Sequence, residues 1–332
     1  MDCEKYNLDK KKLVGLVNSF AKAKILVIGD LMLDEFIWGK VSRISPEAPV
    51  PVVRVTSQSY ILGGSANVAN NIHSLKGKVS IAGIIGDDEI GKKMLDEFQK
   101  RNIDTEMVII DKSRPTILKT RVIAHSQQIV RVDREKTEAV DEFITTQIIE
   151  GTKKIINEID AIIIEDYGKG VITSRLLKEV LQLARQHNKV VSVDPKIDHF
   201  SLYKKVDIIT PNHHEAGAFI GAEITDETSL LAVGKRLIEI LEGTAVLITR
   251  GEEGMSLFEP NGDVTHIPTV AKEVYDVSGA GDTVIGTLTL VLSIGGSFKE
   301  SAIISNFAAG VVVGKVGVAT VSPEELISAI NI

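Results

Sequence analysis

Lys24-Ile25-Leu26-Val27-Ile28-Gly29 is a short apolar run, rich in β-branched residues, that ends at a glycine. A strand that is apolar on both faces is typical of a parallel sheet covered by helices on each side. Similar runs recur at residues 79–83, 161–164, 190–193, 206–209 and 245–249, and segments with helical spacing lie between them, including 88–101, 141–158 and 174–187. This alternation predicts an α/β fold of the doubly wound class, with a mostly parallel sheet and helices on both faces.

Two stretches depart from this alternation, residues 35–60 and 115–133. The first holds Pro46, Pro49 and Pro51 between extended runs, and the second alternates polar and apolar residues. Alternation with a period of two indicates a sheet with one solvated face. We therefore expect one domain over residues 1–332 that carries a small β-sheet flap. The flap can be a lid beside an active site or a contact in a homodimer, and both can hold, because an exposed strand edge favours pairing.

The composition excludes several classes of protein. The chain has 332 residues and a formal net charge of -7, so it has no general basic field for nucleic acid or for an acidic membrane. Cys3 is the only cysteine, which excludes an internal disulfide framework and a cysteine-based zinc cluster. The charged N-terminal stretch has no apolar core of a signal peptide, and the longest uncharged run, 283–298, is too short to span a bilayer. We expect a cytoplasmic protein with no nucleic-acid or membrane partner, and run 283–298 to be a buried helix.

The segment Gly279-Ala280-Gly281-Asp282-Thr283 leads directly into an apolar helical run. Glycines before a helix let the backbone approach a phosphate, with free N–H groups and the positive end of the helix dipole facing it. The same dipole favours the carboxylate form of Asp282, so we expect a low pKa and a group able to accept a proton. A weak base is sufficient for phosphoryl transfer, which has a loose transition state. The alternative is an ordinary glycine-rich helix start with Asp282 in its first turn.

Other residues fit a ligand site near the ends of predicted strands. Gly63-Gly64 before Asn67 allows a sugar to lie against the backbone, although a tight strand–helix turn has the same pattern. Asp30 and Asp34 follow the first strand, where α/β sheets place ligands, and Asp30 alone also fits a simple turn cap.

A second pair of polar residues lies later in the chain. Asn212 and Glu215 share one face if a helix begins at Pro211, and their oxygens suit a hard cation; a solvated first turn is the alternative.

The sequence resembles the ribokinase/PfkB family of carbohydrate kinases in three places. The family's C-terminal signature is matched by residues 276–283 (DVSGAGDT), its Gly-Gly signature by 63–69 and its Asn-x-x-Glu motif by 212–215. The matches follow the family order and span nearly the whole chain. The resemblance implies a ribokinase-like fold, ATP with Mg²⁺ as phosphoryl donor, and Asp282 as catalytic base. It also implies that the N–H groups of Gly279, Ala280 and Gly281 form an anion hole.

The same resemblance implies roles for further residues. Asp34 would bind sugar hydroxyls beside Gly63, Gly64 and Asn67. Asn212 and Glu215 would act through the Mg²⁺-phosphate and its waters. Thr249 and Gly251 would touch phosphate or ribose, and Ala302, Asn306 and Val313 would line an adenine pocket, although small apolar residues there also fit ordinary helix packing. The family often holds a monovalent cation such as K⁺, and Asp276 and Ser278 lie where it would bind.

Longer segments carry a more specific resemblance. Residues 42–53, 166–170, 273–286, 309–317 and 320–323 are similar to the D-glycero-β-D-manno-heptose 7-phosphate kinases of ADP-heptose and lipopolysaccharide biosynthesis. This implies phosphorylation of the C1 hydroxyl to give heptose 1,7-bisphosphate. Many such relatives also carry a nucleotidyltransferase with a His-x-Gly-His motif. This sequence has no such motif, so we expect the kinase alone, with adenylylation left to another protein.

A phosphorylated sugar needs cations at its far end, because phosphate is bound by arginine forks and lysine ammonium groups. The candidates are Lys169, Arg43, Arg121 and Arg131, each of which also fits a solvated surface charge. A related kinase of fructose, fructose phosphate, ribose or a nucleoside would share the rest of the machinery. The alternative outside the enzymes is a non-catalytic sugar-binding module. Such a module is expected to have lost the catalytic base, and the presence of Asp282 argues against it.

Overall fold

The computed structural model describes residues 9–331 except 126 and 272, and its main feature is a nine-stranded sheet. Cys3 lies outside the described residues. Parallel strands form most of this sheet, in the order β5 (Asp104–Ile110), β4 (Lys78–Ile85), β1 (Lys24–Gly29), β8 (Ala161–Glu165), β9 (Val190–Asp194), β10 (Ile208–Ile209) and β11 (Ala245–Thr249). The antiparallel strands β12 (Met255–Phe258) and β13 (Val264–Ile267) complete one edge. The predicted strands are therefore confirmed, although the run at 206–209 contributes only two residues.

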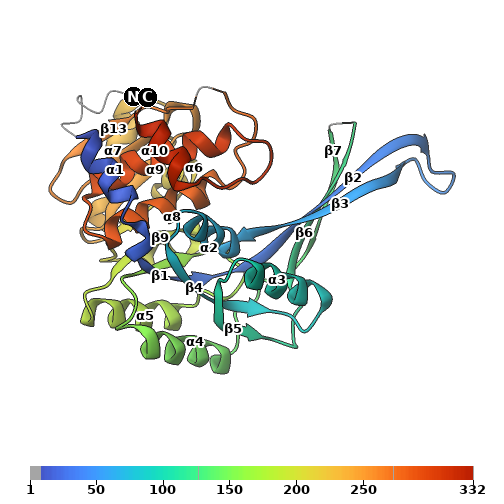
Figure 1. Cartoon of the computed structure of the whole chain (residues 1–332), viewed down its shortest axis with the longest axis horizontal. Coiled ribbons are helices and arrows are strands. Elements are labelled where there is room, and N and C mark those ends of the chain that lie inside the picture. The colour runs from blue at the N-terminus through green and yellow to red at the C-terminus, as the bar shows by residue number, and fades with distance from the viewer. Residues whose placement is uncertain (1–8, 126, 272, 332) are drawn as a thin grey trace.

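Helices cover both faces of this sheet, as Figure 1 shows. Successive residues of β1 point into opposite cores, Ile25 and Val27 into one and Leu26 and Ile28 into the other. The first core is covered by α1 (Lys10–Val17), α2 (Ser65–Ser74), α3 (Glu89–Lys100), α8 (Ala280–Ser293), α9 (Phe298–Val313) and α10 (Pro323–Asn331). The second is covered by α4 (Glu142–Ile155), α5 (Ser174–Gln186), α6 (His213–Ile220) and α7 (Glu227–Ile240). The fold is therefore of the predicted doubly wound α/β class.

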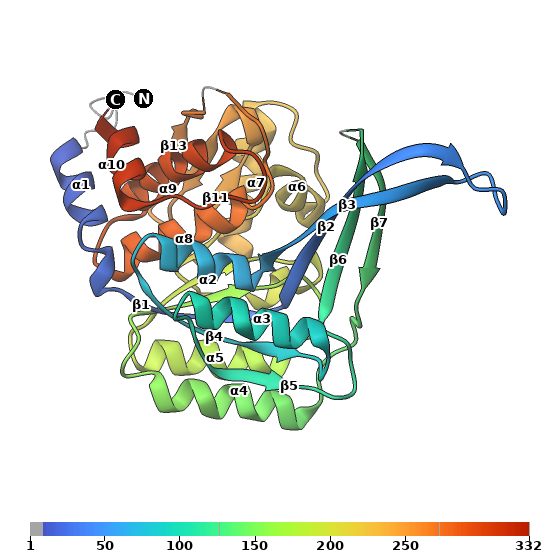
Figure 2. The ribbon, with the colours of Figure 1, turned by 45° about the vertical axis from the view of Figure 1, so that its right-hand side comes forward.

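A separate four-stranded sheet forms the flap, in the order β3 (Pro51–Gly64), β2 (Leu31–Ile44), β6 (Ile117–Ala124) and β7 (Gln127–Arg134). It confirms the second sheet expected from residues 35–60 and 115–133. The β2–β3 hairpin extends well away from the body of the molecule (Figure 2). Trp38, Val55, Val130 and Val132 on these strands are exposed.

The predicted buried helix over 283–298 is α8, whose side chains from Asp282 to Val291 are buried. Among the described residues, no helix combines the length and the apolar character that a bilayer crossing requires.

The topology gathers polar groups at one edge of the main sheet. Asp30, Glu165, Asp194 and Thr249 lie at or just after the carboxyl ends of β1, β8, β9 and β11. The first turn of α8 lies above these ends, because α8 packs on β1, β8 and β9. The flap begins at the same edge, since β2 starts at Leu31, immediately after Asp30. Ligands of open α/β sheets bind at this edge.

Candidate active site

The turn before α8 has a backbone that requires glycine at Gly279. Gly279 has a φ of 79°, in the left-handed region, and a Cβ added there would lie 2.8 Å from Asn67 Nδ2. The carbonyl of Gly279 accepts the Thr283 N–H at 3.0 Å, while the Ala280 N–H donates to the carbonyl of Val277 at 3.2 Å. The Ala280 N–H is therefore engaged within the turn, and of the three predicted anion-hole groups the N–H groups of Gly279 and Gly281 remain the candidates.

Asp282 lies in the first turn of α8 with both carboxylate oxygens hydrogen-bonded. Asn67 Nδ2 donates to Oδ2 at 2.6 Å, and the Tyr167 hydroxyl donates to Oδ1 at 2.9 Å. Asn67 is held on α2, and α2 packs directly against α8; Thr283 Oγ1 also donates to Asn71 Oδ1 at 2.9 Å. The carboxylate of Asp282 is thus fixed in orientation from two separate elements.

The pKa of Asp282 differs from the sequence-based expectation. Burial raises it above the ordinary aspartate value, and the hydrogen bonds from Asn67 and Tyr167 offset only part of that effect. The expectation of a low pKa was wrong because it counted the helix dipole and not the depth of the residue, whose side chain is only 6 % exposed. A carboxylate with a raised pKa is a better proton acceptor, so the base role gains from the difference.

Asp282 belongs to a cluster of three carboxyl groups. Glu165 and Asp194 are direct neighbours on β8 and β9, and one oxygen of each lies within 4.8 Å of one oxygen of Asp282. Burial and mutual repulsion raise the pKa of both Glu165 and Asp194 well above their ordinary values. Both Glu165 oxygens are buried and accept no hydrogen bond from any residue that the structure describes. Three dehydrated carboxyl groups at this spacing favour a cation or a shared proton beside them.

A cavity of about 300 Å³ opens between this cluster and the inner end of the flap. Its wall contains the predicted sugar-binding residues Asp34, Gly63, Gly64 and Asn67, together with Gly279, Gly281 and Asp282. Gly63 has no room for a side chain, because a Cβ there would lie 2.4 Å from Asp34 Oδ2. The cavity therefore offers a backbone surface, carboxylates and an amide to a small polar ligand. The remaining wall residues are Met32, Phe36, Lys119, Arg121, Tyr167, Asp194, Ser278 and Val318.

Two cations of the flap line this cavity, Arg121 and Lys119. The Arg121 guanidinium forms an ion pair with the carboxylate of Asp34 and lies over the Phe36 ring. The Lys119 ammonium lies 5.5 Å from the centre of the Tyr167 ring, and burial lowers its pKa. Sequence reasoning predicted Arg121 and missed Lys119 and Tyr167. Lys119 and Arg121 are two apart on one strand and so share a face, a signal that could have found Lys119.

The other predicted phosphate ligands lie off the cavity wall. Arg43 is exposed near the far end of β2. Arg131 is opposite Arg121 on β7, exposed, and paired with Asp133 at 3.0 Å. Lys169 Nζ is paired with Glu135 at 2.5 Å. The structure thus brings only Arg121 of the four into the cavity.

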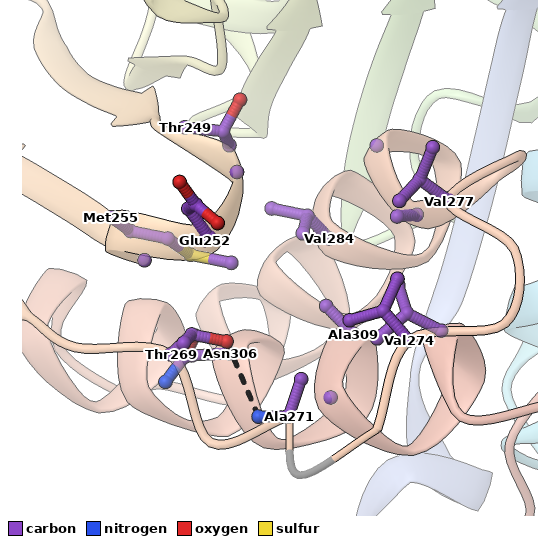
Figure 3. A pocket seen from close by; sticks show the side chains of 16 residues that line it. Thr249, Glu252, Met255, Thr269, Ala271, Val274, Val277, Val284, Asn306 and Ala309 are labelled. Atoms are coloured by element: carbon purple, nitrogen blue, oxygen red, sulfur yellow. Dashed lines mark hydrogen bonds between the residues drawn. The ribbon is translucent and has the colours of Figure 1, made fainter.

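A second, largely apolar cavity of about 520 Å³ lies on the other side of the α8 turn (Figure 3). Thr249 and Gly251 from the β11 end, Asn306 and Val313 from α9, and Ala280 and Gly281 line it. Val284 and Ala309 face Met255 across it in Figure 3. Asn306 Nδ2 donates to the carbonyl of Pro268 at 2.9 Å, which fixes the loop along one wall. The predicted Ala302 is fully buried in the core and does not line the cavity.

Gly281 is common to the walls of both cavities. A ligand in each cavity would therefore approach the other at the first turn of α8. Asp282, the next residue, faces the smaller cavity. This arrangement suits transfer of a group from one ligand to the other beside a buried carboxylate.

The residues predicted to act on metals are held in tight local turns. Asn212 and Glu215 form a reciprocal capping box at the start of α6, with hydrogen bonds of 2.9 and 3.0 Å. Burial, and next the charge of Glu215, raise the pKa of Asp194, so Glu215 lies near enough to the carboxyl cluster to act on it electrostatically. Carboxylate oxygens are the donors that Mg²⁺ prefers. Asp276 Oδ1 accepts the Ser278 N–H at 2.9 Å, and Ser278 lines the smaller cavity.

Sequence comparison gives a match over nearly the whole chain. Residues 22–325 match the family described as pfkB family carbohydrate kinase. The chain is 45% identical over 324 residues to the "Bifunctional protein HldE" of Geobacter sulfurreducens, and 45% identical over 308 residues to the protein of the same name from Helicobacter pylori strain J99. These alignments cover 98% and 93% of this chain, and 66% of each relative. The chain thus spans slightly less than two thirds of the length of these relatives.

Solved structures with the same fold are similar over the same extent. Phosphofructokinase-2 from Escherichia coli, in complex with substrates and products, has a TM-score of 0.77 at 18% identity, covering 93% of this chain and 98% of that chain. Arabidopsis thaliana ribokinase, complexed with ribose and ATP, has a TM-score of 0.75 at 16% identity, covering 93% and 99%. At such identities the likeness shows the fold alone.

Proposed function

The chain belongs to the pfkB family of carbohydrate kinases, and from this premise we propose that it phosphorylates D-glycero-β-D-manno-heptose 7-phosphate at the C1 hydroxyl, with ATP as donor. The product is heptose 1,7-bisphosphate, an intermediate toward ADP-heptose. The observation that carries the proposal is the pair of cavities that meet at Gly281 beside Asp282. The larger, apolar cavity takes the nucleotide, and the smaller, polar cavity takes the sugar.

Asp282 is the base in this reaction. As the C1 oxygen of the sugar forms its bond to the γ-phosphorus of ATP, the bond from that phosphorus to the β,γ-bridging oxygen breaks and ADP leaves. The hydroxyl proton passes to the Asp282 carboxylate. Asn67 and Tyr167 hold that carboxylate toward the cavity, and its burial keeps it a competent acceptor.

The backbone at the start of α8 binds the phosphate in transfer. We assign the phosphate in transfer to the positive end of the α8 dipole and to the N–H groups of Gly279 and Gly281, since the Ala280 N–H is bonded to the carbonyl of Val277. Mg²⁺ supplied with ATP neutralises phosphate charge when bound, and we assign Asn212 and Glu215 to hold its waters. Asp276 and Ser278 are our candidates for a monovalent cation such as K⁺.

Two features favour a phosphorylated sugar. Lys119 and Arg121 present cationic groups in the small cavity, and an arginine fork binds phosphate bidentately. We assign the distal phosphate to Arg121 with Lys119, and the ring hydroxyls to Asp34, Asn67 and the backbone at Gly63 and Gly64. The 45% identity to the HldE proteins supports a heptose substrate over the other sugars of the family.

The flap supports two further proposals. Its inner end forms the wall of the sugar cavity, so it acts as a lid that excludes water. Its exposed apolar residues Trp38, Val55, Val130 and Val132 suit pairing with a second flap in a homodimer. We place the reaction in the cytoplasm, where ATP is available.

The test is ADP release with Mg·ATP on a panel of heptose 7-phosphate, fructose, fructose 6-phosphate, ribose and adenosine. We expect a strong preference for heptose 7-phosphate and a 1,7-bisphosphate product identified by ³¹P NMR. Turnover of another member of the panel would keep the kinase and reject the substrate. Sugar binding by calorimetry without turnover of any member would indicate a binding module and reject the reaction.

A further inference from the structure

We propose that Asp30 and Tyr167 act as a positioning relay for the catalytic carboxylate: Asp30 holds the loop after β8, and the loop holds the Tyr167 hydroxyl on Asp282. The inference rests on the proposed function of Asp282 and adds two residues to its machinery. Tyr167 lines the smaller cavity, and Asp30 lies outside the walls of both cavities.

Asp30 binds the loop through its backbone. Its carboxylate is fully buried and accepts three N–H groups, from Tyr167 at 3.1 Å, Lys169 at 2.9 Å and Val171 at 3.1 Å. Three donors from alternate residues of one loop wrap that loop around a single carboxylate. Such an arrangement fixes the loop backbone with charge-assisted bonds, each stronger than a neutral hydrogen bond.

The loop sequence is adapted to this wrapping. Gly168 and Gly170 have φ values of 65° and 96°, in the region that favours glycine. A Cβ on Gly170 would lie 2.1 Å from the carbonyl oxygen of Glu138, so that position has no room for a side chain. The alternation of glycines with bonded N–H groups therefore lets residues 167–171 fold closely over Asp30.

Asp166 holds the same loop from its other side. Its Oδ1 accepts the Gly168 N–H at 2.8 Å, while its Oδ2 accepts the Tyr203 hydroxyl and contacts His199 Nδ1, both at 2.5 Å. Tyr203 is fully buried, so this anchor is part of the core. With its backbone held on both sides, Tyr167 has little freedom to move its ring.

Tyr167 connects the loop to the reacting carboxylate. Its hydroxyl donates to Asp282 Oδ1 at 2.9 Å, opposite the Asn67 bond to Oδ2. Removal of either bond leaves only one hydrogen bond to restrain rotation of the carboxylate about its last torsion. Since proton transfer depends on the direction of the accepting oxygen, this loss reduces turnover more than it reduces substrate binding.

The experiment is a double-mutant cycle on kcat with Tyr167→Phe, Asp30→Asn and the double variant. We expect each single variant to lose roughly 10-fold or more in kcat with little change in the sugar KM. If Asp30 acts through the Tyr167 hydroxyl, the double variant loses no more than the worse single variant. Losses that multiply, or an unchanged kcat in Tyr167→Phe, would overturn the relay. Tyr60→Phe on the flap, whose hydroxyl accepts from Gln58, is the matched control and should keep kcat.

A second readout needs no sugar and so separates this inference from the proposed function. In protein labelled with ¹³C-tyrosine, the Tyr167 NMR signal is the one absent from Tyr167→Phe. We expect it to shift in Asp282→Asn and in Asp30→Asn, and to stay in place in Tyr60→Phe. If the wild-type enzyme turns over no sugar, the proposed reaction is rejected. The NMR shifts can still support the relay in that case, because they are measured without sugar. A Tyr167 signal indifferent to both aspartate variants would reject the relay itself.

Discussion

Asn67 Nδ2 and Asp282 Oδ2, 215 residues apart in the chain, are joined by a hydrogen bond of 2.6 Å. This bond links the start of α2, just after the Gly63-Gly64 turn, to the first turn of α8. The two glycine signatures therefore form one site, in which Asn67 of the first signature orients the carboxylate of the second.

Asp282→Asn removes the proton acceptor and keeps the shape of the side chain. We expect turnover to fall by orders of magnitude, while sugar binding is retained, because the hydroxyl proton has no nearby carboxylate to receive it. Turnover with Mg·ATP and sugar calorimetry on the same preparation measure the two effects. Near-normal turnover would remove Asp282 as the base.

Gly279→Ala places a methyl group where the backbone allows none. The φ of 79° disfavours alanine by roughly 1 kcal/mol, and the new Cβ, 2.8 Å from Asn67 Nδ2, pushes that amide away from Asp282. We expect kcat to fall even at temperatures where the melting curve shows that the variant is still fully folded. Gly295→Ala is the control, since Gly295 has a φ of 88° and open space around it. Equal kcat in the two variants would separate Gly279 from catalysis.

Lys119→Met keeps the length and the apolar stem of the side chain and removes its charge. We expect the KM for a phosphorylated sugar to rise about 10-fold or more, because the cavity loses one of its two cations. Lys40→Met, on the outer part of β2, is the flap control. An unchanged KM for the phosphorylated sugar in Lys119→Met would contradict the assignment of Lys119 to the substrate phosphate.

Ala309→Phe fills the larger cavity from α9, opposite Met255 (Figure 3). We expect the KM for ATP to rise about 10-fold or more while calorimetry shows unchanged sugar binding, since Gly281 is the only described residue that lines both cavities. A variant that loses sugar binding and keeps its affinity for ATP would reverse our assignment of the cavities.

Asp30 makes stability depend on pH with a defined sign. Burial raises the pKa of its carboxyl from 3.8 to about 6, so the folded protein holds this proton more tightly than the unfolded chain does. The stabilisation is complete below pH 3.8 and is lost as pH rises through about 6, by about 3 kcal/mol in total. Urea unfolding of wild type and Asp30→Asn across this range should show their difference in unfolding free energy falling with pH. A difference that rises with pH would mean that the three N–H bonds outweigh burial.

The sequence predicted the sheet well because its strands are buried on both faces. Strands such as Lys24–Gly29 and Ala161–Glu165 consist largely of consecutive apolar residues, and this local pattern is enough to predict a strand that is buried on both faces. The glycine-rich start of α8 and the Gly63-Gly64 turn could also be predicted from sequence, because the positive φ angles at Gly64 and Gly279 favour glycine.

The rest depended on contacts between distant segments. The pKa of Asp282 is set by its burial under the sheet edge, by the hydrogen bonds from Asn67 and Tyr167 and by the charge of Asp34, none of which the spacing near residue 282 indicates. Arg43 and Arg121 looked equivalent in sequence, and only the length of the β2–β3 hairpin carries Arg43 away from the cavity. The role of Tyr167 could not be predicted from sequence, because it depends on a loop that folds over Asp30, a residue 137 positions earlier in the chain.

The shared wall at Gly281 has a stereochemical consequence. Glycine has no side chain to separate two ligands at the point where the cavities meet, and in our proposal the neighbouring Asp282 accepts a proton and does not attack phosphorus. The proposed transfer is therefore a single in-line displacement, and a single displacement inverts the configuration at phosphorus. A γ-phosphate made chiral with oxygen isotopes and sulfur would therefore emerge on the sugar with the opposite handedness.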